Sequence, residues 1–248
     1  MIKNERQNQI YSMLMEKGFV TVDELSRKFF ISESSIRRDL AKLESNRLVK
    51  RSYGGAQLIN SVEKIAPFGI RTYKDVEAKK IIAKKAVELI NNGDIVFLDQ
   101  ASTSYFLSIE IMKCKSVTIV TNNREIINLL AGTDFTVISS GGTISKANNN
   151  CFLGQIAQRT FEQIYANVAF FSAKALPSDG AISDFSQDEV FVRNSILAHA
   201  DKKVFLCDSS KFDKHSAYKQ CTLADVDYFI TEKDDISKYT RQFPNLNH

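Results

Sequence analysis

The chain has 248 residues, of which 44% are hydrophobic and 25% are charged. This composition is typical of a globular protein and excludes fibrous and disordered classes. No apolar run approaches the roughly 18 residues that a transmembrane helix needs. The charged start MIKNERQNQ lacks the apolar core of a signal peptide. We therefore expect a cytoplasmic protein without a membrane partner.

Metal and disulfide chemistry are not expected. The four cysteines and three histidines are scattered along the chain, with no C-x-x-C pair. Zinc sites and disulfide frameworks show short, regular spacings instead. The sequence therefore predicts no metal, no cofactor and reduced thiols.

The net charge of +4 is unevenly distributed. Residues 1–56 contain 11 basic and 7 acidic residues, whereas the rest of the chain contains 22 of each. An excess confined to the N-terminal quarter suggests that this quarter binds a polyanion.

The N-terminal quarter contains three short helical patterns. They cover about residues 3–17, the segment after Thr21, and residues 32–45. Thr21 and Glu24 fit a capping box, and Ser32 is the expected N-cap of the third helix. A strand at 48–50 and a Gly-Gly turn follow. This order predicts a winged helix-turn-helix domain over residues 1–56.

The third helix has two different faces. At 100° per residue, Ile36, Leu40 and Leu43 form an apolar face, and small, hydroxylated and basic residues lie opposite. Serine bonds phosphates or base edges, and arginine bonds guanine bidentately. A merely solvated basic face is the alternative, which the charge excess disfavours. The expected DNA-binding residues are Thr21, Ser32, Ser34, Ser35, Arg37, Arg38, Lys42, Lys50, Arg51 and Tyr53.

Residues 57–74 read as a linker with room for one short helix, and a regular alternation follows. Helices are expected at 74–90, 102–113, 123–131, 152–164 and 186–200. Strands are expected at 95–99, 117–121, 135–139, 168–172, 203–207 and 227–231. The alternation predicts an α/β domain over 75–235, with a mainly parallel sheet covered on both faces. Residues 236–248 read as a polar, loosely held tail.

Ligands of such sheets bind beyond the carboxyl ends of the strands. There the chain places hydroxyls at a helix start, a Gly-Gly loop, lysines and carboxylates, which suit a phosphate and sugar hydroxyls. Each loop alone could be a plain cap or turn, but together they predict a phosphorylated-sugar site. The expected effector-binding residues are Asp99, Ser102, Thr103, Ser104, Asn122, Gly141, Gly142, Lys174, Asp184, Glu189 and Lys211.

The segment VTVDELSRKFFISESSIRRDLAKLESNRLVKRSYGGA resembles the N-terminal signature of the DeoR family of bacterial transcription regulators. A departure is Asn46-Arg47, where the family often has a glycine. GDIVFLD, STS, IVTN, SSGG and DSSKF are similar to motifs of that family's sensor domain. Two family glycine patterns, after the first and fourth strands, are missing. The resemblance implies a sensor fold related to ribose-5-phosphate isomerase and a sugar-phosphate effector.

We therefore expect a repressor of a sugar-metabolism operon rather than an enzyme. It would bind double-stranded operator DNA as a dimer or tetramer, with an affinity set by a phosphorylated sugar. Two alternatives remain open. One is an isomerase-like enzyme that uses Lys174, Asp184 or Glu189 as its acid-base group. The other is a DNA-binding protein that responds to no effector.

Overall fold

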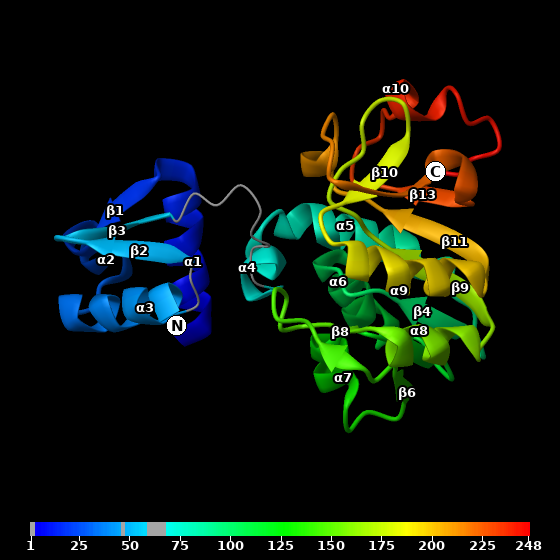
Figure 1. Cartoon of the computed structure of the whole chain (residues 1–248), viewed down its shortest axis with the longest axis horizontal. Coiled ribbons are helices and arrows are strands. Elements are labelled where there is room, and N and C mark those ends of the chain that lie inside the picture. Colours follow the sequence, from blue (N-terminus) through cyan, green and yellow to red (C-terminus); the bar gives the residue numbers. More distant parts are fainter. Residues whose placement is uncertain (1–2, 46–47, 59–67) are drawn as a thin grey trace. The chain divides into compact units, whose positions relative to one another are not determined.

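The computed structural model describes residues 3–45, 48–58 and 68–248. The chain forms two compact units, Met1–Lys74 and Asp75–His248 (Figure 1). Within the described ranges, no helix combines the length and apolar character needed to cross a bilayer. The sequence departure at Asn46-Arg47 lies outside the described residues.

The first unit is a winged helix, as the sequence predicted. Three helices pack with a small antiparallel sheet of strand order β1-β3-β2, whose first strand lies between α1 and α2 in the chain, and a short helix, α4, comes last. The wing extends to residue 58, two residues past the expected end of this domain, and α4 occupies part of the expected linker. The elements are α1 (Lys3–Lys17), β1 (Phe19–Thr21), α2 (Val22–Phe29), α3 (Glu33–Ser45), β2 (Val49–Ser52), β3 (Gly55–Leu58) and α4 (Phe68–Tyr73).

The apolar stripes of the three helices meet in one core. Leu14, Leu25, Ile36 and Leu40 are among its buried residues. The expected capping box at the start of α2 is only half formed. The Thr21 hydroxyl accepts a hydrogen bond from the amide of Glu24 at 3.1 Å, but the Glu24 carboxylate pairs with Lys17.

The two glycines of the wing have different roles. Gly54 is the second of the two residues that join β2 to β3, and its φ of +78° suits position i+2 of a β-turn. Gly55 lies against β1, where an added Cβ would be 2.5 Å from the carbonyl oxygen of Val20. The first glycine therefore supplies a backbone conformation, and the second allows close strand packing.

The second unit is built on a six-stranded parallel sheet with strand order β13-β11-β9-β4-β5-β6. Successive strands run outward from β4 on one side and from β9 on the other. The switch point, where α/β proteins bind ligands, therefore lies between β4 and β9. The strands are β4 (Ile95–Leu98), β5 (Thr118–Thr121), β6 (Thr136–Ser139), β9 (Ala166–Phe171), β11 (Ala200–Leu206) and β13 (Tyr228–Ile230).

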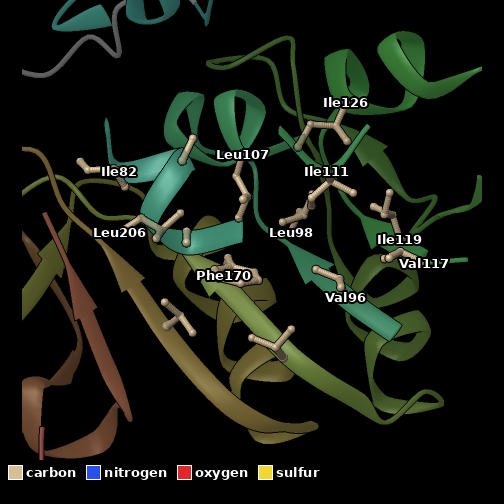
Figure 2. Close-up of a cluster of buried hydrophobic side chains, with 14 of the residues drawn as sticks. Ile82, Val96, Leu98, Leu107, Ile111, Val117, Ile119, Ile126, Phe170 and Leu206 are labelled. Atoms are coloured by element: carbon tan, nitrogen blue, oxygen red, sulfur yellow. The ribbon is translucent and has the colours of Figure 1, made fainter. Parts of the chain in front are cut away.

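Helices cover both faces of this sheet, as its buried strands require. Val96 and Leu98 of β4 pack with residues of α5, α6 and α7, as Figure 2 shows for part of that cluster. Phe97, which points the other way, packs with residues of α8 and α9. The helices are α5 (Val76–Val87), α6 (Ser102–Ile111), α7 (Arg124–Leu130), α8 (Gln155–Glu162) and α9 (Gln187–Ala198).

Two short antiparallel pairs accompany the sheet, and neither was predicted. The sequence does not reveal them, because strands of two to five residues give little periodic signal. Residues 152–153, expected to begin a helix, instead form β8. The pairs are β7 (Thr143–Ile144) with β8 (Phe152–Leu153), and β10 (Ala181–Asp184) with β12 (Tyr218–Thr222).

The prediction of a loosely held tail is wrong. Ile236, Tyr239 and Leu246 are buried in a cluster with Phe229, and the short helix α10 (Ser237–Thr240) lies among them. The amide of Phe229 also donates to the carbonyl of Asn247 at 2.8 Å. Three spaced apolar residues anchor this segment although its average composition is polar.

We expect Gly55→Ala to destabilise the wing by about 1–3 kcal/mol, because the new methyl group must displace the backbone of β1. Native-state hydrogen exchange of residues 19–21 and 55–58 measures this loss. Gln57→Ala, at an exposed position of β3, is the control and should leave exchange unchanged. Equal exchange in both variants would contradict the packing role of Gly55.

Candidate DNA-binding face and effector site

A buried carboxylate fixes the inner face of α3. Asp39 is fully buried, and it accepts hydrogen bonds from Arg6 Nε at 2.6 Å and Gln7 Nε2 at 2.9 Å. Both partners belong to α1. Because a buried charge must be compensated, this contact ties the two helices together. Sequence analysis missed it, although Asp39 lies one turn before Leu43 on the apolar side of the helix.

The outer face of α3 is exposed, hydroxylated and basic. Arg37 pairs with Glu33 one turn earlier, at 2.7 Å. Arg38 bonds the hydroxyl of Ser35 at 3.2 Å. The Ser32 carbonyl accepts from the amide of Ile36, so Ser32 immediately precedes the helix as expected. Arg37 and Arg38 are both exposed, whereas Ile36, Asp39 and Leu40 of the same helix are buried.

The expected wing residues have different surroundings. Lys50 is exposed on β2, and Tyr53 is fully exposed at the turn. Arg51 instead fastens the wing to α3: its amide and its Nε bond Glu44 at 2.9 and 2.6 Å. The backbone N–H of Arg51, followed by its guanidinium, lowers the pKa of Glu44. Arg51 therefore has a structural partner within the first unit, which we call the head.

Two further expected DNA-binding residues differ in availability. Thr21 is half-buried, and its hydroxyl caps α2, so this oxygen already has a partner. Lys42 is exposed near the end of α3. No ion pair joins it to another residue of the described ranges.

In the second unit, Asp99 lies at the end of β4, at the switch point of the sheet. Its carboxylate accepts from the amides of Ala101 and Ser172 at 3.0 and 3.1 Å, and from the Ser104 hydroxyl at 2.5 Å. Ser172 follows β9, so Asp99 joins the two central strands. The residue is fully buried, and its acceptor positions are occupied by protein groups.

Arg193 of α9 completes this buried network. Its Nε bonds Asp99 at 3.2 Å, its Nη2 bonds Asp184 at 3.1 Å, and its Nη1 bonds Gln220 at 2.9 Å. Burial alone would lower the pKa of Arg193, but the nearby carboxylates of Asp184, Asp99 and Glu189 outweigh it and raise that pKa. The arginine is therefore charged and balances the acidic side chains around it.

Glu189 and Gln100 extend the Arg193 network to Asn122, which follows β5. The Glu189 carboxylate accepts from Gln100 Nε2 at 2.9 Å and from Asn148 Nδ2 at 3.2 Å. Asn122, at the end of β5, donates to Gln100 Oε1 at 3.3 Å. Asp99, Ser104, Asn122, Asp184 and Glu189 were expected to bind an effector, and the structure brings them together. Their shared contacts make them a scaffold at the sheet edge.

A second charged group lies at the end of β11. Lys211 Nζ is 3.6 Å from Asp208 Oδ2. Burial would raise the pKa of Asp208, but Lys211 and the hydrogen bonds from Ser210 hold it below its ordinary value. Lys211 is half-buried, and Lys79 on α5 also acts on Asp208 electrostatically. In the described ranges, no hydrogen bond or ion pair links Lys211 to the Arg193 network.

The other expected effector residues lie at a helix start and on loops that follow the strands. Ser102 and Thr103 open α6, and Ala101 before them provides no side-chain cap. Their amides therefore retain the anion preference of a helix start. Gly142 is required for packing, because a Cβ would lie 2.6 Å from the Leu153 carbonyl oxygen. Lys174 is exposed after β9.

Arg193 and Gln100 were the main residues that the sequence analysis overlooked. A signal for Arg193 existed, because it lies four residues after Glu189 and four before Leu197, on the buried side of α9. Across the part of the chain that the structure describes, no cluster of three His, Cys, Asp or Glu side chains suits a metal ion.

The first unit is a winged helix with a basic outer face, and the second is an α/β unit with polar groups at its switch point. This combination is typical of a DNA-binding protein whose second unit binds a small ligand. The family models agree with this class. Residues 6–62 match the DeoR-like helix-turn-helix domain, and residues 74–233 match the DeoR C-terminal sensor domain. The chain belongs to the DeoR family of transcription regulators.

Relatives across several bacteria carry regulator names. The HTH-type transcriptional regulator GolR of Listeria innocua is 32% identical, over 92% of this chain and 90% of its own length. The glycerol-3-phosphate regulon repressor of Escherichia coli is 28% identical, over 94% and 92%. The lactose phosphotransferase system repressor of Staphylococcus epidermidis is 29% identical, over 96% and 95%. The family and these names identify a transcription regulator rather than an enzyme.

Among solved structures, ribose 5-phosphate isomerase A of Neisseria gonorrhoeae aligns with 54% of this chain and 52% of its own. The sequence identity is 18% and the TM-score is 0.41. A likeness this distant has no bearing on activity.

We expect Arg193→Leu to destabilise the second unit by about 3–5 kcal/mol, because it leaves the carboxylates of Asp99 and Asp184 buried without their cation. Urea unfolding, with hydrogen exchange of residues 187–198 to locate the loss, measures this effect. Gln187→Leu, at an exposed position of the same helix, should change stability by less than about 0.5 kcal/mol. Similar losses in both variants would disprove the role of the network.

Proposed function

We propose that this chain represses a sugar-metabolism operon by binding operator DNA through the outer face of α3. The observation that carries the proposal is the division within that helix. Ile36, Asp39 and Leu40 are buried, while Arg37 and Arg38 are exposed on the other side. A recognition helix needs this arrangement, because one side packs and the other enters the major groove.

We further propose that a phosphorylated sugar changes the operator affinity by binding at the carboxyl edge of the sheet. The uncapped start of α6 suits a phosphate group. Asn122 Oδ1 and Asp208 Oδ2 are buried and accept no hydrogen bond from the described residues, although Asp208 Oδ2 has the Lys211 ammonium 3.6 Å away. Such acceptors suit sugar hydroxyls. The names of the relatives, which refer to glycerol 3-phosphate and a lactose phosphotransferase system, fit this effector class.

The proposed regulator is a cytoplasmic homo-oligomer, a dimer or tetramer. Paired helix-turn-helix units read half-sites about 34–36 Å apart, or multiples of that distance. A sensor can regulate such binding only if the effector has different affinities for the DNA-competent and the DNA-incompetent arrangements.

The alternative of an isomerase-like enzyme is less well supported. Of its three candidate acid-base groups, Asp184 bonds Arg193, and Glu189 accepts from Gln100 and Asn148. A general base must be able to reach a substrate proton. Carboxylates that already have these buried partners are better suited to holding the sheet edge.

We expect Arg38→Ala to weaken operator binding by roughly 1–3 kcal/mol, because arginine can bond guanine bidentately. Fluorescence anisotropy with the DNA upstream of the chain's own gene measures this change. Arg124→Ala, which removes an exposed arginine of the second unit, is the control and should bind normally. Unchanged affinity in Arg38→Ala would remove Arg38 from the set of reading residues.

We expect Lys211→Ala to abolish the response to a phosphorylated sugar while DNA binding survives, because the variant loses a cation that could neutralise the phosphate. The assay is the operator titration repeated with a panel of phosphosugars. Lys214→Ala, at an exposed position three residues away, should keep the response. A normal response in Lys211→Ala would argue against the proposed site.

A further inference from the structure

The turn between α2 and α3 contains an unusual residue. Phe30 has φ 55° and ψ 42°, a left-handed backbone conformation, and the residue is 94% exposed. A bulky side chain in this conformation is a steric outlier that glycine or asparagine would relieve. An exposed phenylalanine also forgoes the burial that its ring would otherwise gain. Two unfavourable features therefore coincide at one position.

The surrounding contacts hold the ring out of the core. The amide of Phe30 and that of Ile31 both donate to the carbonyl of Ser26. The Ser26 hydroxyl donates back to the carbonyl of Ile31 at 2.6 Å. Phe29 and Ile31, the two neighbours, pack against the core of the head. Because these contacts fix the turn, Phe30 points away from the core on which its neighbours pack.

The neighbourhood of the ring suits a polyanion. Phe30 is two residues before Ser32, the hydroxylated residue that precedes α3. Lys28 is exposed at the end of α2, and no ion pair joins it to another residue in the described segments. The cation and serines that flank Phe30 in the sequence differ from the broad apolar surface that is typical of the core of a protein–protein interface.

We propose that Phe30 packs against a thymine methyl group in the major groove of the operator and thereby contributes to sequence specificity. Phe30 is the C-cap of α2 and lies in the short turn that leads into α3, and the N-terminal residues of a recognition helix meet base edges. Phenylalanine is an apolar partner for the thymine C5-methyl. The inference rests on the proposed role of α3 as the reading helix. It adds an apolar contact to the hydrogen bonds that the serines and arginines can make.

The test compares the full-length chain with Phe30→Asn and Phe30→Gly, two residues that accept the left-handed conformation. The duplex is selected from a random pool with the full-length wild-type chain. Both variants should bind it at least roughly tenfold more weakly, since the apolar burial of the ring is lost. Their melting temperatures should equal or exceed that of the wild type. A loss of affinity therefore cannot be attributed to unfolding.

Replacing one thymine at a time by deoxyuridine then locates the contact. At one position in each half-site, loss of the methyl group should weaken wild-type binding but leave the Phe30 variants unaffected. Normal binding by both variants, while Arg38→Ala binds weakly, would overturn the inference and leave the proposed function intact. A loss of affinity with no sensitive thymine, or a change in sedimentation that indicates contact with a second copy, would also overturn it. Failure of the wild type to select any duplex would instead refute the proposed function.

Discussion

Both units of this protein depend on the compensation of carboxylates that are excluded from water. An isolated buried carboxylate is very unfavourable, and removing one partner of a buried pair is costly. In the head, Asp39 is compensated by Arg6 and Gln7. In the second unit, Asp99 and Asp184 share Arg193. Each group joins elements that are far apart in the sequence, so each restricts how those elements can pack.

These restraints position the surfaces on which function depends. Asp39 holds one side of α3 against α1, and the side that we propose to bind DNA is exposed. Arg193 holds α9 against the end of β4, next to the uncapped start of α6. The Arg51–Glu44 contact adds a further restraint by fastening the wing to α3. In both units, buried ionic contacts hold a rigid frame, and the groups available to a partner lie at its edge.

The regular part of the fold could be predicted from the sequence. The three-helix pattern, the alternation of helices and strands and the two-faced α3 all follow from the period of apolar residues, and all were confirmed. The short strands were missed because two to five residues carry too little periodicity. Leu246 and the other tail anchors were missed because a polar average conceals three spaced apolar side chains.

The candidate sites were predictable only in outline. Side-chain type and place in the chain drew attention to Asp99 and Glu189, whose role in effector binding stays a prediction. Neither feature could show that these carboxylates face Arg193 and Gln100, because such pairing depends on how distant segments pack. A charged residue spaced like its apolar neighbours, as Arg193 and Asp39 are, is the signal that could have revealed both networks.

The central claim is that one unit binds an operator while the other controls that binding through a phosphorylated sugar. The most direct measurement is the operator affinity of the full-length chain at fixed salt, titrated with phosphosugars and with their unphosphorylated counterparts. The claim predicts that at least one phosphorylated compound changes the affinity, by about 5–150-fold for a typical coupling energy, and that its unphosphorylated counterpart does not. The same affinity throughout the panel would contradict it.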